Sequence, residues 1–236
     1  MGAVGNAGGT IVVVDVLRFS TAVEAAVAAR ARAFPYWWRD ASAEAFAASL
    51  GAVLADGHAS AGPSLSPASL LGLPAGTSVV LRSLNGSACS LLAAETGARV
   101  VAGCLRNATA VAQWVKQQPG PVSVVAAGEH WPDGSLRPCV EDLVGAGAIL
   151  RHLPGKLSPE AAAAVGAFVA MEGELADVLS HSASALELSE KGHADDVAYS
   201  LTYDTSTTVP VLVDGAFTGA AGGPTSDFEG PPPLSL

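Results

Sequence analysis

Short runs of apolar residues recur along the chain, and most of them are continuous rather than alternating with polar positions. Continuous runs rich in valine are typical of strands that are buried on both faces of a sheet. Each run is only a few residues long, as expected for a strand. The pattern predicts strands at residues 11–14, 79–81, 99–102, 122–127 and 209–213.

Alanine-rich segments that favour helix lie between these runs. Ser158 and Pro159 mark the clearest helix start, since serine is a good N-cap and proline suits the first helical position. Strands that alternate with helices predict an α/β fold with a mostly parallel sheet and flanking helices. The predicted helices cover residues 20–32, 41–50, 107–116, 141–152 and 158–179.

The chain has no internal repeat and no linker that would force two independent domains. Its 236 residues suffice for one large domain or two small ones. We expect a single α/β domain over residues 1–218, a length that also allows two subdomains. Residues 57–74 are rich in Gly, Ser and Pro and predict a long loop, and residues 219–236 predict a disordered tail.

The composition limits the classes of partner. The formal net charge is −10, whereas a binder of nucleic acid or anionic membranes needs clustered Lys and Arg. No apolar run reaches the roughly 18 residues of a membrane span, and the chain starts unlike a signal peptide. We therefore expect a cytoplasmic protein. Half of the residues are hydrophobic, which suits a homo-oligomer, and the three cysteines lack a CxxC pair for zinc.

Polar residues gather where the predicted strands end, and each group precedes a helix start. In open α/β sheets, ligands bind at the carboxyl ends of the strands, where helix N-termini present free N–H groups. The pattern therefore predicts a ligand site at this edge. The residues are Asp15, Arg18, Ser20 and Thr21 after the first strand, Asn85 and Gly86 after the second, Arg106 and Asn107 after the third, and Gly128, Glu129 and His130 after the fourth.

These residue types suit an oxyanion. Arg18 and Arg106 can clamp a phosphate or sulfonate in bidentate fashion. Carboxylates suit Mg²⁺, a hard cation that often takes only one or two of them together with substrate oxygens. The neutral hydrogen-bonding residues are Ser20, Thr21, Asn85 and Asn107, and the carboxylates are Asp15, Glu129, Glu141 and Asp142.

Each of these residues also has a structural interpretation. Ser20, Asn85 and Asn107 are favoured helix N-caps, Arg18 can be a surface residue, and a lone histidine such as His130 is more often structural than functional.

Some of the acidic residues have a structural explanation and one does not. Glu141 and Asp142 lie in the first turn of a predicted helix, where acidic residues complement the helix dipole. Asp15 is the hardest to explain structurally, because a carboxylate directly after a buried apolar run is costly to desolvate without a partner.

Several known phosphatase mechanisms are excluded. A haloacid dehalogenase type of site needs a second Asp two positions after Asp15, where this chain has Leu17. No cysteine is followed six positions later by the arginine of a cysteine phosphatase. The chain also lacks a G-x-x-x-x-G-K-[ST] loop and a G-x-S-x-G elbow.

Five segments carry a family resemblance. They are IVVVDVLRFSTAV, LRSLNGSA, VVAGCLRNATAVA, AAGEHWPDGSLRPCVEDLVGAGAIL and LSEKGHADDVAYSLTYDTSTTVPVL. In this order they resemble the segments of the 2-phosphosulfolactate phosphatases, whose opening strand and loop read roughly VVIDVLRATT. The resemblance runs from about residue 11 to residue 217.

The resemblance implies an α/β fold and Mg²⁺-dependent hydrolysis of (2R)-2-phospho-3-sulfolactate to 3-sulfolactate and phosphate, a step of coenzyme M synthesis in methanogens. One segment departs from the family. Where the family carries a glutamate, this chain reads ADGHASAGPSLSP, and only Ser66 and Pro67 match. The phosphatase chemistry is therefore better supported than the substrate. The implied site residues are Asp15, Arg18, Ser20, Thr21, Asn85, Gly86, Asn107, Gly128, Glu141 and Asp142.

From the residues and the resemblance together we expect Mg²⁺ on Asp15 and on at least one of Glu141 and Asp142. Arg18 or Arg106 would bind the second acidic group of the substrate. The expected catalytic residues are Asp15, Arg18, Asn85 and Glu129, the last as general acid or base, and the expected substrate-binding residues are Ser20, Thr21, Gly86, Arg106, Asn107 and Gly128.

Two alternatives remain open at this point. The protein can be a phosphatase for another small phosphorylated acid. It can also be a non-catalytic anion-binding protein on the same scaffold, an alternative that the missing glutamate near Gly57 motivates.

Overall fold

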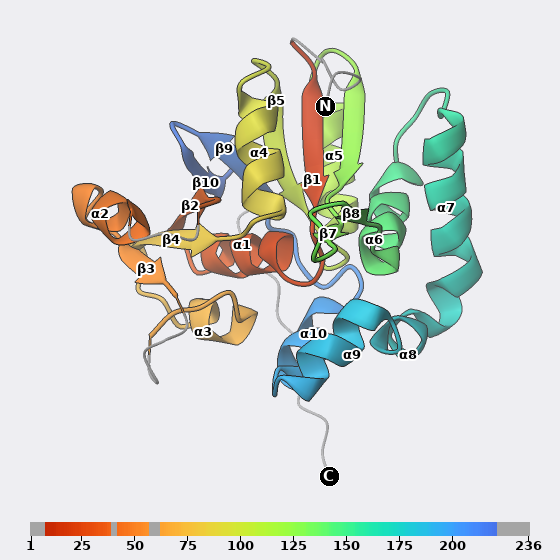
Figure 1. The fold of residues 1–236 in the computed structure, drawn as a ribbon. Coiled ribbons are helices and arrows are strands. Elements are labelled where there is room, and N and C mark those ends of the chain that lie inside the picture. Colours follow the sequence, from red (N-terminus) through yellow and green to blue (C-terminus); the bar gives the residue numbers. More distant parts are fainter. Residues whose placement is uncertain (1–7, 39–41, 57–61, 221–236) are drawn as a thin grey trace, which may run out of the picture.

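The computed structural model describes residues 8–38, 42–56 and 62–220, and it confirms the α/β fold (Figure 1). The strands are β1 (Thr10–Val14), β2 (Arg32–Tyr36), β3 (Val53–Ala55), β4 (Ser78–Arg82), β5 (Arg99–Gly103), β6 (Val122–Ala126), β7 (Glu129–His130), β8 (Leu136–Arg137), β9 (Pro210–Val213) and β10 (Ala216–Gly219). The helices are α1 (Phe19–Ala28), α2 (Ser42–Ser49), α3 (Pro67–Leu71), α4 (Gly86–Ala94), α5 (Ala108–Lys116), α6 (Val140–Leu150), α7 (Pro159–Met171), α8 (Leu175–Ser180), α9 (Ala183–Glu190) and α10 (Ala194–Ser200), with a 3-10 turn η1 (Glu172–Glu174).

The central sheet has eight strands in the order β3-β4-β2-β10-β9-β5-β1-β6 and is mostly parallel, as predicted. β1 lies between β5 and β6 and pairs with both in parallel. β2, β4 and β3 form a second parallel group. The antiparallel hairpin β9–β10 joins the two groups, and three successive antiparallel pairings mean that the groups run in opposite directions.

β1 is the centre of the core because every residue of the strand is buried. Successive side chains of a strand point to opposite faces of the sheet. Val12 and Val14 accordingly pack in a cluster with α5 and α6, whereas Ile11 and Val13 pack in a second cluster with α1. This burial on both faces explains the continuous valine run, and it fixes the position at which the chain leaves the sheet after Val14.

The segment after the predicted first helix differs from the prediction. A helix was expected over residues 20–32, but α1 ends at Ala28, Arg30 takes a left-handed φ of 60°, and Arg32 begins β2. The β2 sequence RAFPY contains an arginine and a proline, so it carries no continuous apolar run. The strand forms because its middle residues are buried between β4 and β10.

Other boundaries also shift. Ser158 caps α7 as predicted, since its hydroxyl accepts from the N–H of Ala161 at 3.2 Å. The predicted helix 158–179 is interrupted by η1, and α3 lies inside the predicted loop 57–74, of which residues 57–61 are outside the described part. β10 reaches Gly219, one residue into the predicted tail, while residues 221–236 are not among the described ones. Within the described residues, no helix is long and apolar enough to cross a membrane.

Candidate functional site

Asp15 lies at the carboxyl end of β1, and the N-termini of two helices converge on it. One carboxylate oxygen accepts from the N–H of Phe19, the first residue of α1, at 3.0 Å. The other accepts from the N–H of Gly86, the first residue of α4, also at 3.0 Å. The side chain is only 5% exposed. The two helix N-termini that the sequence offers to a phosphate therefore hold the carboxylate of Asp15 in this structure.

Asp142 makes the matching connection on the other side of the loop. It lies in the first turn of α6, and its two oxygens accept from the N–H groups of Val16 at 2.7 Å and Gly128 at 2.8 Å. Because Val16 follows β1 and Gly128 follows β6, Asp142 ties the two strand ends together. The loop after β4 belongs to the other parallel group, yet it reaches the same place through Gly86.

Gly86 and Gly128 are glycine for identifiable reasons. A Cβ on Gly86 would lie 2.2 Å from Phe19 Cδ1 and 2.7 Å from the carboxylate of Asp15. Gly128 takes a φ of 68°, and a Cβ there would lie 2.9 Å from the carbonyl oxygen of Arg137. Both were predicted to bind substrate. In this structure their N–H groups bond Asp15 and Asp142, so contact with substrate stays a prediction.

Glu141 precedes Asp142 in α6 and is just as deeply buried, with 2% of its surface exposed. Within the described chain its carboxylate has no hydrogen-bond or ion-pair partner, and no Lys or Arg bonds any of these three acids. Asp15, Glu141 and Asp142 influence one another electrostatically. We call these three residues the carboxylate cluster.

The electrostatics of the cluster reflect its uncompensated charge. Burial raises the pKa of Asp15 to about 6, against the lowering effect of the Phe19 and Gly86 N–H groups. Burial and the charges of Asp15 and Glu141 raise the pKa of Asp142 well above its usual range. A cation placed here would remove this penalty, because an opposite charge favours the ionised form.

The carboxylate cluster does not form a complete metal cage, but it offers the few carboxylates that Mg²⁺ needs. Within the described residues, no group of three His, Cys, Asp or Glu is arranged as a ready metal cage. Mg²⁺, however, usually keeps several waters and takes only one or two carboxylates together with substrate phosphate oxygens. The unpartnered carboxylate of Glu141, next to Asp15 and Asp142, fits that mode of binding.

Asn85 forms a chain with Glu129 and His130 beside the cluster. Its amide nitrogen donates to Glu129 Oε1 at 2.7 Å, and its amide oxygen lies 2.8 Å from Nδ1 of His130. A carboxylate only accepts, so the amide nitrogen faces Glu129 and the oxygen faces a protonated Nδ1 of His130. The structure thus brings together the predicted residues Asn85 and Glu129, with His130, which sequence reasoning had set aside.

The hydroxyls of Ser20 and Thr21 bond the backbone of the loop around Asp15. The Ser20 hydroxyl accepts from the Asp15 N–H at 3.0 Å and donates to the Val13 carbonyl at 2.9 Å. The Thr21 hydroxyl donates to the Val16 carbonyl at 2.8 Å. Both side chains are fully buried. Their predicted role in substrate binding is not tested by these contacts, which show that they fix the turn around Asp15.

The helix-cap interpretation is wrong for Ser20, whereas Asn85 and Asn107 do occupy N-cap positions. Ser20 lies inside α1, whose N-cap is Arg18. Asn85 and Asn107 do precede α4 and α5, but neither side chain makes a capping hydrogen bond. Their amides make longer-range contacts instead, so their side chains connect separate parts of the fold.

Arg18 faces a partner that the sequence did not reveal. Its Nη1 donates to Asp196 on α10 at 2.5 Å, and the hydroxyl of Ser66 donates to the other oxygen of Asp196, also at 2.5 Å. Asp196 lies in the last of the five segments that carry the family resemblance. Its sequence position 178 residues after Arg18 gave no signal of contact.

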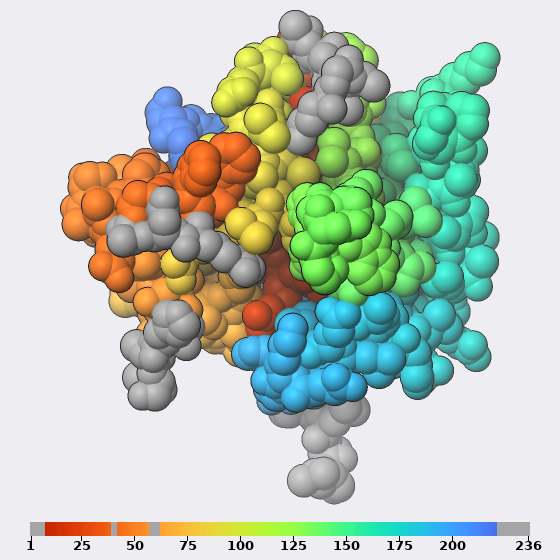
Figure 2. All heavy atoms as spheres, viewed as in Figure 1, coloured from red at the N-terminus to blue at the C-terminus, as the bar shows by residue number. Residues whose placement is uncertain are grey.

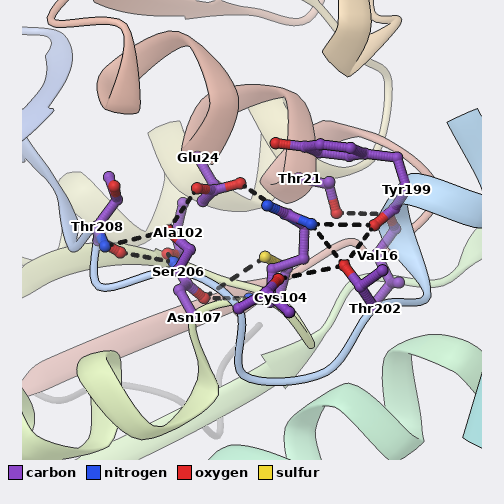
Figure 3. Close-up of polar contacts among 12 residues, drawn as sticks. Val16, Thr21, Glu24, Ala102, Cys104, Asn107, Tyr199, Thr202, Ser206 and Thr208 are labelled. Carbon is purple, nitrogen blue, oxygen red and sulfur yellow. Dashed lines mark hydrogen bonds and ion pairs between the residues drawn. The ribbon is translucent and has the colours of Figure 1, made fainter. Parts of the chain in front are cut away.

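Arg106 and Asn107 belong to a different region, drawn in Figure 3. Arg106 donates to Glu24 at 3.1 Å, to the Thr202 hydroxyl at 2.5 Å and to the Tyr199 carbonyl at 3.3 Å, and its guanidinium stacks on the Tyr199 ring. Within the described chain neither residue bonds the carboxylate cluster. We call Arg106, Glu24, Tyr199 and Thr202 the arginine network.

Asn107 has a comparable structural task. Its amide oxygen accepts from the Cys104 N–H at 2.9 Å, and its amide nitrogen donates to the carbonyl of Thr208 at 3.0 Å (Figure 3). It therefore joins the loop after β5 to the chain that leads into β9. A cavity of about 340 Å³ lies nearby, lined by Thr109, Ala110, Gln113 and residues 204–208, and none of the clustered carboxylates lines it.

The surface is hollowed at the end of β1. Figure 2 shows the N-terminal segment (red) at the bottom of a hollow. The β4–α4 region (yellow), the β7–β8 hairpin (green) and the α9–α10 region (blue) surround it. Segments far apart in the sequence therefore meet around the carboxyl end of β1, although β4 runs opposite to β1 in the sheet.

Comparison with known proteins identifies the family of this chain. The family model of 2-phosphosulpholactate phosphatase matches residues 3–215. A protein of Thermotoga maritima named "Probable 2-phosphosulfolactate phosphatase" is 29% identical over 143 residues, which are 60% of each chain. The "2-phosphosulfolactate phosphatase" of Methanothermobacter thermautotrophicus is 34% identical over 113 residues, 48% of this chain and 47% of that protein.

The matched segments thus span about half to three fifths of these curated relatives. The family model, in contrast, extends over nearly all of the chain. The family resemblance noted in the sequence agrees with that match. The chain belongs to the 2-phosphosulpholactate phosphatase family.

Proposed function

We propose that this protein is a Mg²⁺-dependent phosphatase that hydrolyses 2-phospho-3-sulfolactate to 3-sulfolactate and phosphate. One observation carries the proposal. In a chain of this family, Asp15, Glu141 and Asp142 are buried together at the end of β1, and no cation of the described residues is bonded to them. Such a site gains most from a divalent cation and a phosphate that arrive together.

The metal would be held by Glu141 together with Asp15 or Asp142. When bound, Mg²⁺ supplies charge neutralisation to the phosphate and lowers the pKa of a bound water. The protein's own part is positioning. The N–H groups of Phe19, Val16, Gly86 and Gly128 fix the two aspartates, so the carboxylates are oriented before substrate arrives.

Arg18 is the better candidate for the second acidic group of the substrate. The sequence left Arg18 and Arg106 as alternatives. Arg106 already donates to a carboxylate, a hydroxyl and a carbonyl, whereas Arg18 bonds one carboxylate. An arginine with a free edge can bind a sulfonate or carboxylate in bidentate fashion.

Glu129 is the proposed general acid or base, and Asn85 sets its position. The amide of Asn85 holds one oxygen of Glu129, which also accepts from the backbone N–H of His130 at 3.0 Å. The other carboxylate oxygen is left to exchange a proton with the substrate oxygen or with water.

The test is phosphate release by the purified protein, with Mg²⁺ and with a chelator. 2-Phosphosulfolactate is assayed beside a panel of other phosphorylated small acids. Release that is confined to phosphosulfolactate and lost with chelator would support both chemistry and substrate. Chelator-sensitive release from another ester would keep the chemistry and reject the substrate.

Asp15→Asn is the sharpest variant. We expect it to lower kcat by about a thousandfold while the protein remains folded, because it removes a charge from the reacting centre and keeps the size of the side chain. Asp214→Asn is the matched control, since Asp214 is exposed in a turn with a φ of 50° that asparagine also accepts. Wild-type turnover in Asp15→Asn would contradict the assignment.

A second candidate is a non-catalytic anion-binding protein on the same scaffold. The observation that favours it is in the segment ADGHASAGPSLSP, which lacks the glutamate that the family resemblance implies. Under this alternative, calorimetry would detect binding of phosphosulfolactate by folded protein while no phosphate is released with Mg²⁺ present.

A further inference from the structure

Asp196 joins three separate parts of the chain at the wall of the hollow. It lies on α10 and is only 4% exposed. One carboxylate oxygen accepts from the hydroxyl of Ser66, which precedes α3, at 2.5 Å. The other accepts from Nη1 of Arg18 at 2.5 Å and lies 3.5 Å from Nδ1 of His193. A buried carboxylate with these partners is firmly oriented, because each additional bond removes a degree of freedom.

Arg18 is thereby held by one edge only. Within the described chain, its Nε and Nη2 atoms have no hydrogen-bond partner, and its side chain is 17% exposed. The N–H of the next residue, Phe19, bonds the carboxylate of Asp15, so Arg18 starts from the loop that surrounds the carboxylate cluster. A guanidinium presents its donors in a rigid plane, so a bond at Nη1 also sets the direction of the edge formed by Nε and Nη2.

α10, the helix that carries Asp196, lies at the wall of the hollow. Figure 2 shows the α9–α10 region (blue) as the wall of the hollow below the red N-terminal segment. Figure 1 places α3 and α10 side by side under α1, and the two helices are in contact. Arg18 bonds Asp196 of α10 and directly precedes Phe19, whose N–H bonds Asp15, so its guanidinium bridges α10 and the loop around the carboxylate cluster.

We propose that Asp196 is a positioning residue that orients Arg18 to select phosphate monoesters carrying a second acidic group. It acts through Arg18 and does not touch the substrate. Ser66 supports it by fixing the carboxylate from the side of α3. The inference rests on the proposed function and extends it, because it assigns substrate selection to a contact between α10 and the loop after β1.

The experiment is a double-mutant cycle with two substrates. Wild type, Arg18→Ala, Asp196→Ala and the double variant are assayed with 2-phosphosulfolactate and with phenyl phosphate, which has no second acidic group. The measured quantity is the ratio of kcat/KM for the two esters. We expect this ratio to fall about a hundredfold in Arg18→Ala and about tenfold in Asp196→Ala, mainly through KM for phosphosulfolactate.

The cycle identifies an indirect role. If Asp196 acts through Arg18, adding Asp196→Ala to Arg18→Ala changes the ratio by less than about twofold, since coupled residues are not additive. Additive losses would overturn the proposal. A lower KM for phosphosulfolactate in Asp196→Ala would overturn it too, because Asp196 would then compete with the substrate for Arg18.

Two further variants serve as controls, one for a change at a neighbouring position and one for loss of folding. Asp195→Ala changes the neighbouring, exposed acid of α10 and is expected to leave the ratio as in wild type. Asp196→Asn keeps the shape and serves if Asp196→Ala fails to fold. It is expected to shift the ratio in the same direction by a smaller factor. Equal losses for both esters together with a lower unfolding temperature would mark Asp196 as purely structural and reject the inference.

Failure of the proposed function is distinguishable from failure of this inference. If wild type hydrolyses neither ester, the proposed function is wrong. The same four proteins are then titrated calorimetrically with 3-sulfolactate and with sulfate as a probe without the carboxylate. The positioning role would still be supported if Asp196→Ala weakens the binding of 3-sulfolactate to the otherwise wild-type protein but has no such effect on the Arg18→Ala protein. Equal binding by all four proteins would reject it.

Discussion

Two regions of this molecule bury acidic side chains to the same depth and treat their charge in opposite ways. In the arginine network, Glu24 is 1% exposed and is bonded by Arg106 at 3.1 Å and by the Ser206 hydroxyl at 2.6 Å. In the carboxylate cluster, Glu141 is 2% exposed and has no such partner among the described residues. Burial alone therefore does not distinguish an acid with a compensating partner from one without, whereas the balance of charge does.

The two arginines repeat the contrast. The side chains of Arg106 and Arg18 are similarly covered, at 12% and 17% exposed. Arg106 bonds Glu24, Thr202 and the carbonyl of Tyr199 and stacks on the Tyr199 ring, which closes its environment. Among the residues that the structure describes, Arg18 bonds only Asp196. An arginine whose donors are all bonded within the protein stabilises the fold, whereas one with unbonded donors can still bind a ligand.

The largest expected difference between the two arginines is in their contribution to the stability of the fold. Arg106→Ala leaves Glu24 buried without its cation, and we expect a loss of about 3 to 5 kcal/mol in the free energy of unfolding. Arg18→Ala should cost clearly less, because Asp196 keeps the Ser66 hydroxyl and the nearby His193. Urea unfolding of both variants measures the difference. Equal losses would show that Arg18 is as structural as Arg106.

The carboxylate cluster should make stability depend on pH. The pKa of Asp15 is raised from 3.8 to about 6 in the folded protein, so its protonated form favours the folded state. Its contribution is complete below about pH 4 and is lost as the pH rises through 6, a loss of about 3 kcal/mol. Asp142 shifts in the same direction.

Unfolding by urea at pH 4 to 7, without metal and with Mg²⁺, checks this expectation. The metal-free protein should lose stability over that range, Mg²⁺ should restore it, and Asp15→Asn should flatten the dependence. Stability that rises between pH 4 and 6 in the metal-free protein would contradict the raised pKa of Asp15.

A smaller effect with an unusual sign is expected for Glu141. Its charge raises the pKa of both Asp15 and Asp142, so Glu141→Gln should stabilise the metal-free protein by about 1 kcal/mol. The same change should weaken the stabilisation by Mg²⁺. Glu24→Gln is the matched change in the arginine network and should destabilise instead. If both variants lose stability alike, the two regions do not differ as described.

The sequence predicted the central strands of the sheet better than the contacts between distant parts of the chain. β1, β4, β5 and β6 were found because valine runs report burial on both faces of a sheet. β2 was missed, since its sequence RAFPY has polar and conformationally restricted residues and owes its pairing to β4 and β10. Local patterns register burial, but they do not register a partner strand from elsewhere in the chain.

The same limit applied to the site. Asp15 was singled out because a carboxylate directly after a buried strand is conspicuous in any sequence, and the structure shows it buried and bonded by two backbone N–H groups. Asp196 and Ser66 were not singled out, since nothing near them in the chain indicates Arg18 as a partner. Arg18 and Arg106 were grouped by residue type and position, and only their partners separate them.

The smallest prediction tests whether the arginine network is only structural. Thr202→Val removes the hydroxyl that accepts from Arg106 at 2.5 Å and donates to the Tyr199 carbonyl at 2.8 Å. Arg106 keeps Glu24 and the Tyr199 ring, so we expect a loss of only about 1 kcal/mol in the free energy of unfolding. The kcat/KM ratio between phosphosulfolactate and phenyl phosphate should stay as in wild type, because this network closes on itself. A changed ratio at nearly unchanged stability would mean that Arg106 reaches the substrate after all, and the division between the two arginines would fail.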